Sequence, residues 1–117
     1  MLLTLTFRVD VRIQTIKIRA PQDGRAPRTI KAYLNNPHMD FSNTENTQPI
    51  QTFTLTEKDF KEGEALLPVY FVKFQKVKNL TLFVENNLGN TDTSAISHIS
   101  VFGKSNKTIT KVEGVIE

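Results

Sequence analysis

The chain has 117 residues, of which 38% are hydrophobic and 23% are charged. This length and balance are typical of one folded domain and exclude a disordered or fibrous chain. The chain has no cysteine, which excludes disulfide frameworks, thiolate metal sites and thiol redox chemistry. We therefore expect a single domain over residues 1–117, with a core over about 2–104 and a terminal strand or tail over 105–117.

The net charge of +3 is unevenly distributed, because residues 1–31 are mainly basic and residues 40–64 mainly acidic. The cations stand at alternate positions of expected strands, which favours a solvated sheet face over a nucleic-acid-binding stripe. The first residues do not resemble a signal peptide, and no run reaches the roughly 18 apolar residues that span a bilayer. These features predict a cytoplasmic, or also nuclear, monomeric protein.

Apolar residues recur at every second position through most of the chain, which predicts antiparallel strands with one buried and one solvated face. Examples are Ile16 with Ile18, and Ile30 with Ala32. The sequence predicts an all-β sandwich of about eight strands, over about 3–9, 15–19, 29–34, 50–55, 66–75, 79–85, 96–103 and 107–112.

The connections between these strands have clear breaking signals. Pro21, Pro27 and the Asp-Gly pair at 23–24 predict a loop, and residues 86–94 form another loop by composition. The polar stretch 35–49 is too long for a hairpin turn and predicts a crossing between sheets, as in Greek-key and jelly-roll topologies. Thr56 precedes Asp59 by three residues, which predicts one short helix near 57–62.

The most hydrophobic expected strands are 66–75 and 79–85. In the first, Tyr70, Val72 and Phe74 are expected to share a buried face, while Lys73 and Gln75 point the other way. In the second, the buried residues are Leu80, Leu82 and Val84. We expect this pair of strands in the centre of the core.

No pattern in the sequence indicates catalysis. The only histidines are His38 and His98, which do not form a cluster with the spacing of metal ligands, and no nucleophile or phosphate-binding motif occurs. Carboxylates such as Asp40 and Glu85 show no specific pairing. We therefore expect no enzymatic activity, no cofactor and no metal.

Several motifs resemble those of PITH domains, in the family's order. The central ones are Phe71-Val72-Lys73-Phe74-Gln75-Lys76-Val77 and Leu80-Thr81-Leu82-Phe83-Val84-Glu85-Asn86-Asn87. Others start at Thr15, Pro27, Met39 and Leu55, and Val101-Phe102-Gly103 resembles the last core strand. The resemblance spans about residues 15–103, and its specificity comes from the ordered set of motifs.

This resemblance implies a jelly-roll sandwich similar to galactose-binding domains, either attached to a thioredoxin domain or nearly free-standing. It also implies association with the 26S proteasome regulatory particle. Family members usually have an acidic segment before the first strand, whereas this sequence begins almost on that strand. The sequence also lacks the paired cysteines of a thioredoxin domain, so oxidoreductase activity does not transfer to it.

The sequence therefore predicts a non-catalytic protein-interaction module whose partner is a subunit of the proteasome regulatory particle. The first alternative is a small-ligand or carbohydrate-binding module, for which the absence of tryptophan leaves few stacking groups. The second alternative is nucleic-acid binding. The candidate partner contacts are exposed or loop residues of the expected sandwich: Lys73, Gln75, His38, Met39, Phe41, Glu57 and Asp59.

Overall fold

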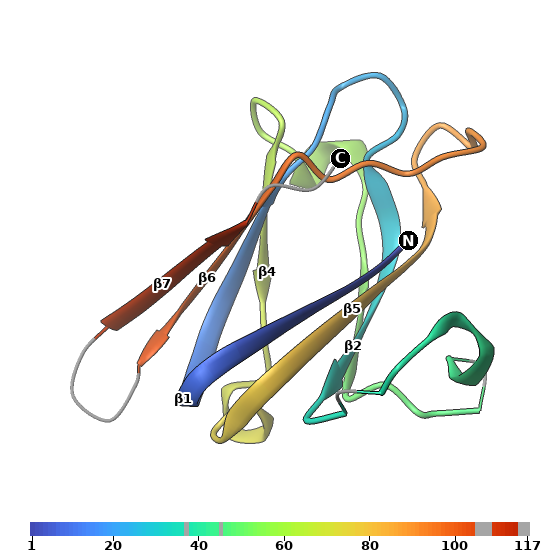
Figure 1. Cartoon of the computed structure of the whole chain (residues 1–117). Helices are drawn as coiled ribbons and strands as arrows, with labels where there is room; N and C mark the ends of the chain where they lie inside the picture. Colours follow the sequence, from blue (N-terminus) through green and yellow to red (C-terminus); the bar gives the residue numbers. More distant parts are fainter. Residues whose placement is uncertain (37, 45, 105–108, 115–117) are drawn as a thin grey trace.

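The computed structural model describes residues 1–36, 38–44, 46–104 and 109–114, with the side chains of 41, 104 and 109–114 outside the description. Within these ranges the chain forms strands and short 3-10 turns (Figure 1). The strands are β1 (Leu2–Arg19), β2 (Pro27–Leu34), β3 (Gln51–Thr54), β4 (Glu64–Pro68), β5 (Val77–Asn87), β6 (His98–Lys104) and β7 (Ile109–Gly114). The turns are η1 (Phe41–Asn43), η2 (Glu57–Asp59) and η3 (Phe71–Lys73).

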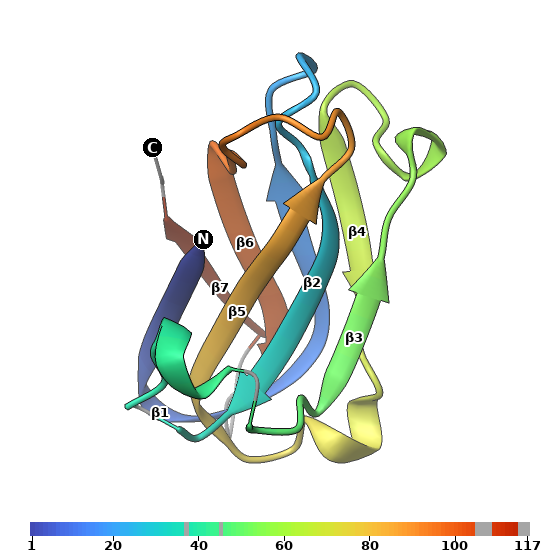
Figure 2. The ribbon, with the colours of Figure 1, turned by 90° about the vertical axis from the view of Figure 1, so that its right-hand side faces the viewer.

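The described strands form one antiparallel seven-stranded sheet in the order β3-β2-β5-β1-β6-β7, with β4 also paired to β1. Strand β1 is long and bent. Its first half pairs with β5, and its second half pairs with β4 and β6. The sheet therefore wraps around the core as a nearly closed, barrel-like structure (Figure 2).

The bend in β1 explains why two expected strands, 3–9 and 15–19, are one strand. The pairing register with β5 shifts between Thr6 and Val11, and Val9, between these positions, is 52% exposed. In the sequence, Leu3, Leu5, Phe7 and Val9 alternate with polar residues, so the period of two predicts that Val9 is buried. Alternation fails here because the chain passes from one layer to the other at this point.

One hydrophobic core fills the space inside the sheet. The alternation is confirmed for Ile16, Ile18 and Ile30, which are fully buried, and for Leu80, Leu82 and Val84, which are at most 3% exposed. Strand β5 lies between β2 and β1 and contributes heavily to this core. Its central position agrees with the prediction.

The expected strand 66–75 is wrong in its second half. Strand β4 ends at Pro68, and the chain then turns through η3, where the Phe74 amide donates to the Phe71 carbonyl over 3.1 Å. Strand β4 pairs with β1 and not with β5. Aromatic and β-branched residues favour a strand, but here the chain has to reverse direction between β4 and β5, and the reversal overrides that preference.

The short helix expected near 57–62 is a single 3-10 turn, η2, followed by an extended residue, Phe60. The capping interaction between Thr56 and Asp59, from which the helix was predicted, is present. The Asp59 carboxylate accepts from the Thr56 amide at 2.7 Å and from the Thr56 hydroxyl at 3.2 Å. These bonds satisfy the start of a turn, but the backbone is already extended at Phe60, and Glu62 and Gly63 further on have positive φ angles, so no helix forms over 57–62.

Among the described residues β3 pairs with β2 and β4 pairs with β1, and no ladder of hydrogen bonds joins β3 to β4, so the barrel-like sheet has an open seam between these two strands. The side chain of Gln51 bridges this seam. Its amide nitrogen donates to the Pro68 carbonyl at 3.2 Å, and its amide oxygen accepts from the Tyr70 backbone at 2.9 Å. The Gln51 side chain thus links the two edges.

We expect Gln51→Ala to lower the free energy of unfolding by about 1–2 kcal/mol, because two hydrogen bonds to the backbone are lost. Urea denaturation followed by circular dichroism measures this change. Thr52→Ala, at an exposed position of the same strand, is the matched control and should leave the midpoint unchanged. Equal midpoints for both variants would show that Gln51 does not hold the seam.

Candidate functional site

The seven candidate contact residues lie at opposite ends of the molecule. Lys73 and Gln75 lie at or beside η3, and His38, Met39 and Phe41 lie in the 35–50 connection at the same end, called here the tip end (Figure 1). Glu57 and Asp59 lie in η2 at the other end, called the cavity end. The strands run between these two ends, so the candidates cannot form one compact site.

Three consecutive apolar residues are exposed at the tip end. Tyr70, Phe71 and Val72, called here the apolar tip, are 60%, 38% and 86% exposed. Tyr70 and Val72 had been expected on one buried face with Phe74, and this expectation is wrong for both. The 3-10 turn rotates Val72 outward and leaves Phe74 fully buried.

The apolar tip is held rigidly by its neighbours. The Lys73 amide donates to the Tyr70 carbonyl at 2.8 Å, and the Gln75 side-chain amide donates to the Phe71 carbonyl. On the core side, the carbonyl of Phe74 accepts from the Ile13 amide at 2.9 Å. Gln75 therefore supports the turn, and the buried Phe74 anchors it in the core.

Lysine residues occur directly after the apolar tip. Between Glu64 and Glu85 the sequence has three lysines, Lys73, Lys76 and Lys78, and no carboxylate. The Lys73 ammonium lies 5.6 Å from the centroid of the Tyr70 ring, and Lys78 donates to the Arg8 carbonyl at the bend of β1. The tip end therefore combines exposed apolar area with basic side chains.

A groove of about 350 Å³ adjoins the tip. We call it the tip-end groove; its lining residues come from three separate segments and are Tyr33, Leu34, Asn36, Thr47, Gln48, Pro49, Ile50 and Lys73. Tyr33 is buried, donates from its hydroxyl to the Thr44 carbonyl at 3.2 Å, and has its pKa raised by that burial. Lys73 belongs both to the groove and to the apolar tip.

The remaining tip-end candidates differ in their exposure. His38 is exposed, whereas Met39 is 7% exposed, so its side chain closes this end and is not presented to solvent. Phe41 begins η1, but its side chain lies outside the described residues. Asp40 caps that turn, and the hydrogen bond from the Ser42 hydroxyl holds the pKa of Asp40 below its usual value.

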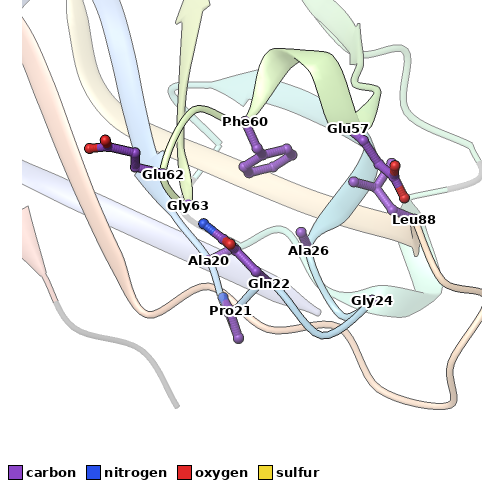
Figure 3. Close-up of a pocket in the computed structure, with 10 residues that line it drawn as sticks. All are labelled: Ala20, Pro21, Gln22, Gly24, Ala26, Glu57, Phe60, Glu62, Gly63 and Leu88. Atoms are coloured by element: carbon purple, nitrogen blue, oxygen red, sulfur yellow. The ribbon is translucent and has the colours of Figure 1, made fainter.

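The cavity end has a cavity of about 670 Å³ (Figure 3). It lies between the 20–26 loop, the 57–63 segment and Leu88, with the Phe60 ring near its centre and Glu57 among its lining residues. Gly24 and Gly89 keep its loops close, since a Cβ on Gly89 would lie 2.8 Å from the Gly24 Cα. Asp59, by contrast, caps η2 and does not line the cavity.

The described residues contain no group of three or more histidines and acidic side chains able to hold a metal ion. Among the same residues, no helix is long and apolar enough to cross a membrane. The apolar tip could not be recognised from its residue types, because aromatic and β-branched residues favour a strand. A usable signal was present, however, since the run Val69 to Val72 is apolar at every position and so breaks the period of two.

The chain matches the PITH domain family over residues 1–117. Thioredoxin-like protein 1 of Schizosaccharomyces pombe is 32% identical over 108 residues, which cover 89% of this chain and 37% of that protein. PITH domain-containing protein 1 of Dictyostelium discoideum is 31% identical, with 80% of this chain and 45% of that protein covered. The Homo sapiens protein of the same name is 30% identical, with 89% of this chain and 47% of that protein covered. The chain thus spans less than half the length of these relatives.

Proposed function

Because the chain belongs to the PITH domain family, we propose that it is a non-catalytic protein-interaction module that associates with the proteasome regulatory particle. The observation that carries the proposal is the apolar tip, in which Val72 is 86% exposed. The resemblance of the sequence to PITH domains supplies the identity of the partner. Cytoplasmic and nuclear localisation is part of the same proposal.

The physical case for a binding surface rests on exposure and rigidity together. Consecutive exposed apolar side chains are unfavourable in water, and a cluster of them marks an interaction site more often than a structural one. The turn that presents them is fixed by hydrogen bonds and by the buried Phe74. A preformed tip binds with a small loss of conformational entropy, and aromatic residues such as Tyr70 are frequent at the energetic centre of interfaces.

We expect the purified chain to capture regulatory particles from a cell lysate, and Lys73→Glu to weaken that capture without lowering thermal stability. Val72→Asp should abolish capture, because it places a charge at the centre of the apolar tip. Both side chains are exposed, so neither change disturbs the core. Affinity capture followed by quantitative mass spectrometry of proteasome subunits measures the effect.

Lys58→Glu makes the same charge change at the cavity end, where Lys58 is exposed. It should capture as much regulatory particle as the unmodified chain. Failure of the unmodified chain to enrich proteasome subunits would overturn the proposed partner. If Lys73→Glu and Lys58→Glu lost the same amount of captured regulatory particle, the loss would depend on the net charge of the protein and not on a contact at the apolar tip.

A second candidate function is supported by the cavity at the opposite end. We propose, as the alternative, that a jelly-roll module similar to galactose-binding domains holds a small polar ligand such as a sugar there. Phe60 offers an aromatic face, while Gln22, Glu57 and Glu62 offer hydrogen-bonding groups. A thermal-shift screen with monosaccharides should show saturable stabilisation that Phe60→Ala removes. No stabilisation by any sugar would reject this alternative.

A further inference from the structure

We propose that the tip-end groove binds an extended segment of a protein partner in which a large apolar side chain stands next to a carboxylate. This inference rests on the proposed function, because it names the chemistry of the partner. The groove is a recess of about 350 Å³, at the small end of the range found for ligand sites. A recess of this size accommodates a single inserted side chain better than the surface of a folded protein.

The apolar part of the segment is indicated by the walls of the groove. Leu34, Pro49 and Ile50 line it and are only partly buried, so their exposed area is available to an inserted side chain. The polar residues Asn36, Thr47 and Gln48 are arranged around the same recess. Such groups can form hydrogen bonds with the backbone of a peptide that lies across the groove.

The walls of the tip-end groove are held in place by hydrogen bonds within the chain. The Ile50 amide donates to the Ala32 carbonyl at 2.8 Å, and the Tyr33 hydroxyl donates to the Thr44 carbonyl. The next residue, Gln51, is tied to Pro68 and Tyr70 across the seam. On binding, the partner segment therefore loses conformational entropy, but the groove, which is already ordered, does not add to this cost.

The acidic part of the segment is indicated by Lys73. Lys73 lines the groove, its ammonium lies 5.6 Å from the centroid of the Tyr70 ring, and no described carboxylate forms a salt bridge with it. Lys76 and Lys78 follow in the sequence, and their backbones lie beside Asn35, whose side chain donates to the Lys76 carbonyl at 2.9 Å and accepts from the Lys78 amide at 2.7 Å. A carboxylate beside the inserted side chain would meet the uncompensated charge of Lys73, whereas a basic segment would be repelled.

The geometry favours a peptide over a membrane surface. A bilayer would contact the protruding Val72 and Tyr70 side chains, and it would leave the recess between residues 34–36 and 47–50 unused. Only a narrow chain fills the recess and reaches Lys73 at the same time. Anionic lipid binding is therefore a competing outcome of the experiment and not the proposal.

A library of random linear peptides displayed on phage tests the proposal directly. Selection against the intact chain should enrich sequences that place aspartate or glutamate next to leucine, phenylalanine or a similar residue. A synthetic peptide of the enriched sequence should shift the amide resonances of Ile50 and Lys73 in an NMR titration. Lys73→Glu should weaken its affinity by about tenfold or more, and the matched Lys58→Glu should not change it.

The proposal is overturned if no sequence is enriched, if enriched peptides lack acidic residues, or if Lys73→Glu binds them as well as the unmodified chain does. Co-sedimentation with phosphatidylserine vesicles that Val72→Asp prevents, without peptide enrichment, would assign the surface to membranes. The enriched peptide added in excess should also block capture of regulatory particles. Capture that survives this competition but is lost in Val72→Asp would leave the proposed function standing and reject the groove as the partner's site.

Discussion

Phe74→Ala should lower the free energy of unfolding by about 3–5 kcal/mol, because it leaves a cavity in a close-packed core. Phe74 is fully buried among core residues from several strands. Its side chain also anchors the turn that carries the apolar tip, so the loss should extend to capture of a partner. Denaturant titration measures the stability, and unchanged unfolding would show that the ring does not fill the core.

Val72→Ala is the matched control for this change. Val72 is two residues from Phe74 and 86% exposed, so its truncation should alter stability by no more than about 0.5 kcal/mol. A strand at this position would bury both side chains on one face, and the two variants would then both be destabilised. The pair of measurements therefore distinguishes the 3-10 turn from a strand.

Gly103→Ala should destabilise the protein by about 3 kcal/mol or more, as forced overpacking does when the neighbours cannot move. A Cβ at this position would lie 1.8 Å from the Arg12 carbonyl oxygen and 2.8 Å from the Arg12 carbonyl carbon. Both atoms belong to the backbone of β1, which pairs with Gly103 next to a shift in register between Ile13 and Thr15. The reason is therefore close approach of two backbones and not an unusual φ angle.

Ser100→Ala is the control within the same strand. The Ser100 hydroxyl is buried and has no hydrogen-bond partner among the described residues. Its removal should leave stability equal or slightly higher, since no bond is lost and a buried polar group disappears. Thermal unfolding by differential scanning calorimetry should separate the two variants clearly. A Gly103→Ala protein as stable as Ser100→Ala would contradict the backbone contact.

The all-β class, the buried faces of the regular strands and the family could be predicted from the amino-acid sequence alone. Leu80, Leu82 and Val84 in β5 are buried as the period of two predicted, because a strand inside one sheet keeps its side chains alternating. The ordered motifs that resemble PITH domains depend on residue identity alone, and the family match over residues 1–117 confirms them. Lys73 was predicted to be exposed from its alternation with Val72 and Phe74, and it is exposed, although it lies in a 3-10 turn and not in a strand.

The ends of the strands and the surfaces that they create could not be predicted in this way, because they depend on the three-dimensional arrangement of distant segments. Val9 and Val72 have apolar identities that fit a buried strand, yet one lies at the bend of β1 and the other in the reversal between β4 and β5. Met39 is in a polar loop but is buried, because that loop folds back over the tip end. The tip-end groove joins Leu34, Ile50 and Lys73 from segments distant in sequence. Such positions depend on long-range packing, which local periodicity does not contain.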